Sequence, residues 1–475
     1  MLVSHRVIEH SNIAFGTSGA RGLVEHFNPD VCAAFTVAFV QTMRFAFSFN
    51  TLAIAIDNRP SSYAMAQACA SAAQQLGLTV IYYGVLPTPA LANQAMALSI
   101  PAIMVTGSHI PFDRNGLKFY RPDGEITKAD ESSIINGQFT FEPITNLVAL
   151  QTSLDAANAY VSRYLDLFDS PFLAGKRIGF YQHSSAGRDI YPALFEQLGA
   201  EVVLIGRSDT FVPIDTEAVS EADHQHAIDW TKQYQLDALF STDGDGDRPM
   251  LADEHGQWLR GDLLCLLCAK ALNIDALAIP VSCNTAVELT GAFKLVMRTK
   301  IGSPYVIAGF SALQGNYPTF AGFEANGGFL LGSDIKVNQQ LLKALPTRDA
   351  LLPILMVLFA AKEQSISALS ANLPTRFTHS DRVTEFAVEK SKQIIGFGHA
   401  FPGKLLAQLG LGENNLSKLC SVDGLRFNLT SGDVVHLRPS GNAPEFRCYA
   451  ESDSLQKAQS LVSQVLPKLA SLSLV

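Results

Sequence analysis

The stretch IPAIMVTGSHIP, residues 100–111, combines an apolar run with a polar loop of small residues. The apolar part predicts a buried strand, and Gly107 predicts a tight turn where that strand ends. In an α/β sheet, the loops that follow the strands build the functional site. Ser108 lies in such a loop, with His109 beside it and Lys118 ten residues later. Ser108 is therefore a candidate phosphoryl acceptor, although a plain polar turn explains the same residues.

The segments around this stretch alternate between strand and helix patterns. Strand patterns occur at residues 52–56 and 79–83, with apolar helix patterns at 31–47 and 61–76. The alternation starts again near residue 176, where a strand pattern at 176–181 is followed by residues 183–187, which are expected to open a helix. It starts a third time near residue 261. This pattern predicts α/β domains with helices on both faces of each sheet. After residue 373, several strand patterns, one of them at 376–388, precede a last amphipathic helix at residues 455–472, which predicts an α+β terminal domain.

Composition excludes several classes of protein. The 475 residues are too many for one ordinary core, and 48% hydrophobic with 17% charged residues is typical of a well-packed globular chain. A net charge of -9 argues against a nucleic-acid surface, because binding the phosphate backbone needs clustered positive charge. We therefore expect no nucleic-acid partner, and each basic residue is a candidate for a site.

Membrane contact is not expected either. The longest apolar run, residues 351–361, is too short to span a bilayer, and the first residues lack the apolar segment of a signal peptide. Seven cysteines, an odd number scattered along the chain, predict reduced thiols in the cytoplasm. Cys265 and Cys268 lie within an apolar helix pattern and are expected to pack in a core.

The most informative loop follows a predicted strand at residues 238–241 and reads TDGDGDRP. Its carboxylates, Asp243, Asp245 and Asp247, are separated by single glycines and can surround one hard divalent cation. Without a cation these charges would repel each other. A strand rather than a helix precedes the loop, so it is not an EF-hand. Three protein ligands leave room on Mg²⁺ for another ligand, and a phosphoryl oxygen is the natural candidate.

Three further loops have residues suited to anions or sugars. The loop FGTSGARG, residues 15–22, offers backbone N–H groups and Arg21 to an anion. In the loop GFEANGG, residues 322–328, a Glu and an Asn between glycines can hydrogen-bond sugar hydroxyls, although a plain hairpin is an alternative. In RPSGNAPEFR, residues 438–447, two arginines frame a Ser-Gly-Asn turn that would bind a phosphate. A solvated hairpin face is the alternative there.

These five loops, in this order, resemble those of the α-D-phosphohexomutases, the phosphomannomutase/phosphoglucomutase superfamily. The resemblance extends over nearly the full length of the chain. The chain is similar to the family's N-terminal motif at residues 15–22, to its phosphoserine loop at 106–111 and to its metal loop at 243–248. Residues 322–327 correspond to the sugar-recognition loop and residues 438–442 to the phosphate loop. Departures occur at Gly107 and Ile110 in the serine loop, in the sugar loop, where the usual Ser and His are missing, and at Asn442 and Ala443.

The resemblance implies an α/β architecture of three related α/β/α domains with mixed sheets, and a C-terminal α+β lid domain around a central cleft. The expected domains are residues 1–148 with the phosphoserine loop, 149–258 with the metal loop, 259–372 with the sugar-recognition loop and 373–475 with the phosphate loop.

The resemblance also implies roles for individual residues. Phosphorylated Ser108 would exchange a phosphoryl group with a hexose phosphate through a hexose 1,6-bisphosphate, which also serves as activator. Mg²⁺ would bind Ser108 and the three aspartates, and His109 or Lys118 would move the proton. The expected catalytic residues are Ser108, His109, Lys118, Arg21 and Arg248; the metal ligands are Ser108, Asp243, Asp245 and Asp247; the substrate-binding residues are Thr17, Ser18, Glu324, Asn326, Arg438, Ser440, Gly441, Asn442 and Arg447.

Mannose 6-phosphate and mannose 1-phosphate are the expected substrates, on the basis of Glu324 and its loop. Glucose and glucosamine phosphates, as in phosphoglucomutases and phosphoglucosamine mutases, are the alternatives within the family. Two other classes stay open: a metal-dependent sugar phosphatase that uses Ser108, and a non-catalytic sugar-phosphate sensor. A second phosphate-binding loop, at residues 438–447, argues against the phosphatase, because simple hydrolysis would not need it. A nucleophile beside a metal loop argues against the sensor, because binding alone needs no nucleophile. The expected partners are small sugar phosphates, and the sequence does not indicate an oligomeric state.

Overall fold

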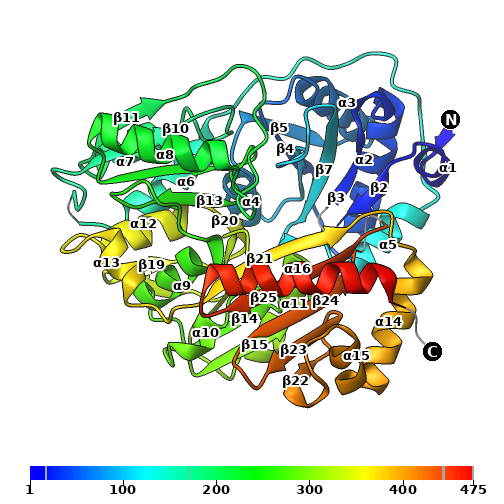
Figure 1. The fold of residues 1–475 in the computed structure, drawn as a ribbon. Coiled ribbons are helices and arrows are strands. Elements are labelled where there is room, and N and C mark those ends of the chain that lie inside the picture. The colour runs from blue at the N-terminus through cyan, green and yellow to red at the C-terminus, as the bar shows by residue number, and fades with distance from the viewer. Residues whose placement is uncertain (17–18, 170, 441–443, 473–475) are drawn as a thin grey trace. The chain divides into compact units, whose positions relative to one another are not determined.

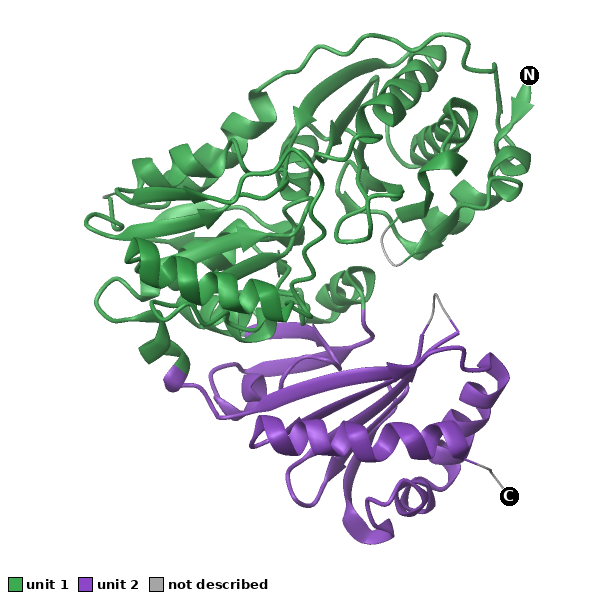
Figure 2. Ribbon diagram, turned by 45° about the horizontal axis from the view of Figure 1, so that its top comes forward, with its two compact units in different colours: residues 1–275, 302–370 green, residues 276–301, 371–475 purple. Residues whose placement is uncertain are grey.

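The computed structural model describes residues 1–16, 19–169, 171–440 and 444–472. The chain forms two compact units. Unit 1 contains residues 1–275 and 302–370, and unit 2 contains residues 276–301 and 371–475 (Figure 2). The chain therefore leaves unit 1 and returns to it once before ending in unit 2.

The first sheet of unit 1 contains the serine loop. Its strand order is β2-β3-β7-β6-β4-β5, with β8 on β7. Strands β4, β5 and β6 are parallel, whereas β7 pairs antiparallel with β6 and β3 (Figure 1). The sheet is therefore mixed. Its strands are β2 Ala14–Gly16, β3 Gly19–Leu23, β4 Thr51–Ile56, β5 Thr79–Val85, β6 Ala102–Val105, β7 Arg114–Arg121 and β8 Gly124–Glu125; its helices are α2 Pro29–Arg44, α3 Ser62–Gln75, α4 Thr88–Leu98 and α5 Lys128–Asn136.

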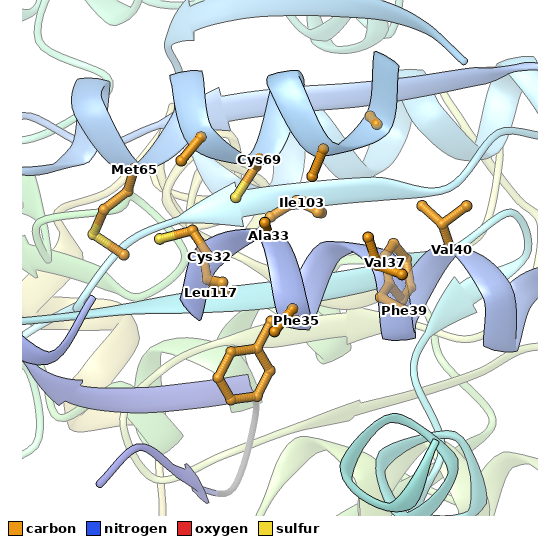
Figure 3. Close-up of a cluster of buried hydrophobic side chains, with 14 of the residues drawn as sticks. Cys32, Ala33, Phe35, Val37, Phe39, Val40, Met65, Cys69, Ile103 and Leu117 are labelled. Carbon is orange, nitrogen blue, oxygen red and sulfur yellow. The ribbon is translucent and has the colours of Figure 1, made fainter. Parts of the chain in front are cut away.

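An apolar core fixes the helices of this domain to the sheet. Helix α2 begins where Asn28 accepts the backbone N–H of Val31 at 3.0 Å, with a proline at its first position. Its buried face then packs on α3 and the sheet (Figure 3). The ring of Phe39 lies 4.9 Å from that of Phe119 on β7. Because β7 also contains Lys118, this core sets the position of a predicted site residue.

The second sheet of unit 1 presents the aspartate loop. Its order is β11-β10-β12-β13, with β10 parallel to β11 and β12, and β13 antiparallel to β12. The rings of Phe180 and Phe240 stack at 4.5 Å across β10 and β12. Strand β12 ends at Thr242, immediately before the loop. The elements are α6 Asp155–Leu165, β10 Arg177–Tyr181, α7 Tyr191–Gln197, β11 Glu201–Ile205, α8 Glu221–Tyr234, β12 Ala238–Thr242 and β13 Pro249–Ala252.

The rest of unit 1 carries the predicted sugar loop between two antiparallel strands, β16 and β17, and β20 pairs with β17. Strands β18 and β19 form a separate hairpin. These elements are α9 Gly261–Ala271, α11 Ser303–Leu313, β16 Phe320–Phe323, β17 Phe329–Leu331, β18 Ile335–Val337, β19 Gln340–Leu342, β20 Leu345–Asp349, α12 Leu351–Ala360 and α13 Ile366–Ala371; near the N-terminus lie β1 Leu2–Val3, α1 Ser4–Glu9, η1 Val24–His26 and β9 Thr140–Phe141.

Unit 2 has a parallel pair of strands, β14 and β15, and an antiparallel sheet of order β21-β25-β24-β23-β22. Helix α16 packs against β21 and β25 (Figure 1). The elements are β14 Ala276–Pro280, α10 Ala286–Leu289, β15 Leu295–Thr299, β21 Phe377–Val383, α14 Val388–Ala400, α15 Pro402–Gln408, η2 Glu413–Asn415, β22 Leu416–Cys420, β23 Leu425–Leu429, β24 Val434–Pro439, β25 Phe446–Ser452 and α16 Leu455–Ser471.

The predicted architecture, several α/β domains with mixed sheets and an α+β C-terminal part, is confirmed. Two local predictions are wrong. The strand expected at 376–388 ends at Val383, because residue 388 begins α14. The helix expected to open at His183 begins only at Tyr191. The four domain boundaries stay a prediction. Among the described residues, no helix has the length and apolar character needed to cross a membrane.

Candidate active site

Ser108 occupies a constrained position directly after strand β6. Its φ of +54° lies in the left-handed region, which a residue with a side chain rarely adopts. The Ser108 backbone N–H donates to Thr106 Oγ1 at 2.8 Å, so a local turn stabilises this conformation. The side chain is buried, and Ser108 Oγ donates to Asp243 Oδ2 at 2.8 Å. The loop therefore holds the serine hydroxyl against the aspartate loop.

Arg59, from the loop after β4, supports the serine loop from within. Its Nη2 donates to the carbonyls of Ser108 at 2.9 Å and Ile110 at 2.5 Å, and its Nη1 to those of Pro111 and Arg114 at 2.7 and 2.8 Å. Four backbone carbonyls thus converge on one buried guanidinium. The sequence indicated only that Arg59 follows a strand; its role in shaping this loop was not predicted.

The three aspartates are gathered into one buried cluster. One carboxylate oxygen from each of Asp243, Asp245 and Asp247 lies within 4.8 Å of the others, and each residue is at most 1% exposed. Gly244 makes the packing possible, because a Cβ there would lie 2.9 Å from the carbonyl oxygen of Ser108. The aspartate loop and the serine loop therefore touch along their backbones.

The cluster is suited to a divalent cation. The Oδ1 atoms of Asp245 and Asp247 are buried, and neither has a hydrogen-bond partner among the described residues. Unpartnered, buried carboxylate oxygens are costly unless they meet a positive charge. Hard oxygen donors of this kind are the ligands that Mg²⁺ prefers. The residues present therefore fit the cation that the sequence predicted.

Cationic side chains partly neutralise the cluster. Lys118 Nζ lies 2.5 Å from Asp245 Oδ2 and 2.8 Å from Asp247 Oδ2. Arg248 Nε lies 3.8 Å from Asp243 Oδ2 and 3.6 Å from Asp247 Oδ1. Burial, followed by the charges of Arg248 and Arg348, lowers the pKa of Arg21 to about 10, so Arg21 also belongs to this group. Six of the predicted basic and acidic residues, the three aspartates with Lys118, Arg248 and Arg21, are thus brought together with Ser108.

The pKa values of the aspartates show that the balance of charge is uneven. Burial, and then repulsion from the other two carboxylates, raises the pKa of Asp243 well above its usual range. Burial also opposes ionisation of Asp245 and Asp247, but Lys118 lowers the pKa of Asp245 and Arg348 that of Asp247. Asp243, which accepts from Ser108, is therefore the carboxylate that would gain most from an added cation.

His109 lies beside Ser108 in its neutral form. Its Nδ1 is 3.4 Å from Ser108 Oγ and 2.8 Å from Nη1 of Arg248, which can only donate. Burial, followed by the charge of Arg248, lowers the pKa of His109 to about 4. A neutral imidazole that already accepts at Nδ1 carries its proton on Nε2.

The sugar loop lies in the same unit. Glu324 and Asn326 are buried, and Arg348 Nη1 donates to Glu324 Oε2 at 3.1 Å. Asn326 Oδ1 accepts the N–H of Gly328 at 3.0 Å, and its carbonyl accepts from Thr216 at 2.8 Å. The loop is thus fixed from both sides, and Arg348 is a further site residue that the sequence did not indicate.

The predicted phosphate loop lies in unit 2. Arg438 on β24 and Arg447 on β25 are directly opposite each other. Arg438 Nε pairs with Asp423 at 2.8 Å, and Arg447 Nη2 with Glu445 at 3.2 Å. The Ser440 N–H donates to the Glu445 carbonyl at 2.8 Å. Two arginines therefore frame the turn as expected. The other predicted substrate residues, Thr17, Ser18, Gly441 and Asn442, lie outside the described residues.

Comparison with known proteins identifies relatives along the whole chain. Family models described as phosphoglucomutase/phosphomannomutase alpha/beta/alpha domain I, alpha/beta/alpha domain II and C-terminal domain match residues 12–142, 158–256 and 382–468. A phosphomannomutase of Salmonella muenchen is 58% identical over 469 residues, 98% of each chain. One of Sinorhizobium fredii is 40% identical over 473 residues, 96% of this chain and 98% of the relative.

The fold has solved counterparts as well. The crystal structure of a phosphoglucomutase/phosphomannomutase family protein from Burkholderia thailandensis superimposes with a TM-score of 0.75 at 20% identity. It covers 96% of this chain and 97% of the other.

The aspartate cluster gives a prediction about metal binding. We expect millimolar Mg²⁺ to raise the melting temperature of the protein, since at 100 times the dissociation constant a ligand adds about 2.7 kcal/mol of stability. Asp243→Asn should abolish this stabilisation without lowering the metal-free melting temperature, because it removes one of three repelling buried carboxylates. Scanning fluorimetry with and without Mg²⁺ measures both. Asp209→Asn, at a 94% exposed side chain, is the control that should keep the full metal response. A full response in Asp243→Asn would contradict the site.

Proposed function

We propose that this chain, which belongs to the phosphoglucomutase/phosphomannomutase family, interconverts mannose 6-phosphate and mannose 1-phosphate through a phosphorylated Ser108. The observation that carries the proposal is the 2.8 Å contact between Ser108 Oγ and Asp243 Oδ2, within a cluster of carboxylates and cations. The sugar is supported by the 58% identity to a phosphomannomutase over almost the entire chain. The enzyme is thus a phosphohexomutase, an isomerase that works by phosphoryl transfer.

The reaction consists of two transfers of opposite direction. In the first, the bond between phosphorus and Ser108 Oγ breaks, and a bond forms to a hydroxyl oxygen of a hexose monophosphate. The proton of that hydroxyl is removed, and Ser108 Oγ ends as a hydroxyl. The resulting hexose 1,6-bisphosphate reorients and returns its other phosphoryl group to Ser108. A free serine cannot begin this cycle, so we propose hexose 1,6-bisphosphate as the activator that phosphorylates it.

The charges around Ser108 serve the transfer. Asp243, Asp245 and Asp247, with an oxygen of phosphorylated Ser108, would hold Mg²⁺, which when bound offsets negative charge on the transferred group. Lys118, Arg248 and Arg21 add positive charge that is already fixed in place. Preorganised charges of this kind stabilise a transition state without the cost of reorganisation.

His109 and Lys118 are the two proposed proton carriers. His109 is neutral and can accept a proton, whereas Lys118 is an ammonium between two carboxylates and can donate one. We propose His109 as the base that removes the proton of the attacking hydroxyl. It would do so at Nδ1, the ring nitrogen without a proton, so its contact with Arg248 Nη1 would have to open first.

Two further loops are proposed to bind the substrate. We propose that Glu324 and Asn326 bind sugar hydroxyls, and that Arg438, Ser440 and Arg447 bind the phosphate that does not react. Thr17, Ser18, Gly441 and Asn442 are proposed substrate residues from the sequence alone. We also propose a cytoplasmic location, supported by the odd number of cysteines, seven, scattered along the chain.

Replacing the nucleophile tests the mechanism directly. Ser108→Ala should lower kcat for conversion of mannose 1-phosphate by about 10⁴-fold or more, because the transferred group then has no carrier. A coupled assay with mannose 1-phosphate, Mg²⁺ and a catalytic hexose bisphosphate measures it, with glucose 1-phosphate and glucosamine 1-phosphate run alongside. Ser133→Ala, on an exposed helix face, is the matched control. Near-normal turnover by Ser108→Ala, or steady release of inorganic phosphate by the unmodified protein, would contradict the proposal.

The proton carrier is tested separately. His109→Gln keeps a similar volume but cannot act as a base, so kcat should fall by about 10²-fold or more while Mg²⁺ binding is retained. Steady-state kinetics and the Mg²⁺-dependent melting shift measure the two effects. A kcat within about twofold of the unmodified enzyme would assign the proton to Lys118 instead.

The phosphate loop should act on binding. A charge-assisted hydrogen bond contributes about 1.5–3 kcal/mol, so Arg447→Ala should raise KM for mannose 1-phosphate by roughly 10- to 100-fold. Lys418→Ala removes an exposed charge from β22, an edge strand of the same sheet, and should leave KM unchanged. An unchanged KM in Arg447→Ala would remove this loop from the substrate site.

A further inference from the structure

Arg348 is a buried guanidinium that joins two loops with different predicted roles. It is 3% exposed and lies next to the last residue of β20. On one side it meets the aspartate loop, and on the other the sugar loop. The sequence around it, TRD at 347–349, gives no signal of this arrangement.

The contact with Asp247 is confined to one oxygen. Arg348 Nε and Nη2 lie 3.0 and 2.9 Å from Asp247 Oδ2, and Lys118 Nζ lies 2.8 Å from the same atom. Asp247 Oδ1 has no hydrogen-bond partner among the described residues, although it is buried. Arg348 therefore occupies one oxygen of this carboxylate. The other oxygen lies 3.6 Å from Arg248 Nε but accepts no hydrogen bond from the described residues, and it remains available to a cation.

The contact with the sugar loop uses the remaining side of the guanidinium. Nη1 of Arg348 donates to Glu324 Oε2 at 3.1 Å and to Ser303 Oγ at 3.2 Å. Ser303 Oγ in turn donates to Glu125 Oε2 at 2.8 Å. The same guanidinium therefore fixes the orientation of Glu324.

Two neighbours show that the fold is built around this side chain. A Cβ at Gly328 would lie 2.5 Å from Cδ and 2.6 Å from Cγ of Arg348, so only glycine leaves room for the arginine stem. Asp349 anchors the end of β20, because it accepts from Tyr160 at 2.6 Å, from Tyr164, and from the N–H of Leu351 at 2.9 Å. Both ends of the arginine are therefore held in place.

We propose that Arg348 is a positioning residue that couples the sugar loop to the metal loop. It orients Asp247 so that Oδ1 faces the cation, and it orients Glu324 so that its carboxylate faces the sugar. A change at Glu324 is thereby transmitted to the cation site through one rigid, planar group. The assignment of metal and sugar to these loops rests on the proposed function.

The proposal is tested by metal binding in the absence of substrate. Isothermal titration with Mn²⁺ or Mg²⁺ gives the dissociation constants of the unmodified protein, Arg348→Gln, Glu324→Gln and the double variant. Loss of a group that orients a metal ligand weakens metal affinity by about 10- to 100-fold, and we expect this in Arg348→Gln. Glu324→Gln, although outside the aspartate loop, should also change metal affinity, by at least about threefold. The two effects should be non-additive, with the double variant no weaker than Arg348→Gln.

Three further measurements separate coupling from stability. Arg348→Lys keeps the charge but cannot contact both carboxylates, so it should recover less than half of the lost metal affinity on a logarithmic scale. Arg376→Gln breaks a comparable ion pair, with Glu451 at 2.7 Å, and should leave metal affinity unchanged. The KM for mannose 1-phosphate should rise in both Arg348→Gln and Glu324→Gln.

Additive effects of the two substitutions would overturn the coupling. Unchanged metal affinity in Glu324→Gln would overturn it even if Arg348→Gln fails to fold, because Glu324→Gln leaves Arg348 in place. Metal binding that behaves as expected in a protein without mutase turnover would sink the proposed function and leave the coupling standing.

Discussion

Repulsion among three buried carboxylates is the constraint on which the rest of the site depends. Asp243, Asp245 and Asp247 bring three negative charges into a volume from which water is excluded, and such charges are unstable without partners. These carboxylates form ion pairs with cationic side chains from three separate segments: Lys118, Arg248 and Arg348. Two carboxylate oxygens, Oδ1 of Asp245 and Oδ1 of Asp247, still accept no hydrogen bond from the described residues. The remaining negative charge is what a divalent cation and a phosphoryl group would share.

The serine loop is adapted to the same constraint. A hydroxyl that carries a phosphoryl group must meet the carboxylates and their cation without moving away between transfers. The left-handed backbone at Ser108 and the four carbonyls that converge on Arg59 make the loop rigid. Arg59 also lies 3.9 Å from the ring centre of Phe211, so the second domain's loop closes over it. Backbone strain of this kind persists only where surrounding contacts determine it, which is common at functional sites.

The sequence was sufficient to predict the parts of the site that are local in the chain. Each of these parts can be seen within one short segment of sequence. One is the regular spacing of the three aspartates, and the other is the position of the serine directly after an apolar strand. Arg59, Arg348 and Thr88, whose hydroxyl donates to Asp245 at 2.7 Å, could not be predicted, because their partners are distant in sequence. In unit 2, helix α14 was not predicted: its first residue, Val388, was expected at the end of a strand, although strand β21 ends at Val383. The alternating architecture was predictable because hydrophobic periodicity is repeated over the whole chain.

The central claim is that Ser108 alternates between a free hydroxyl and a phosphoserine. Mass spectrometry of the purified protein, intact and after digestion, tests it most directly. The protein is first treated with a hexose 1,6-bisphosphate and then with excess mannose 1-phosphate. The account predicts one added phosphoryl group, located on Ser108, that is lost to the sugar as hexose bisphosphate appears. A protein that is never phosphorylated, or one whose phosphoryl group lies on another residue or is not discharged by mannose 1-phosphate, would contradict it.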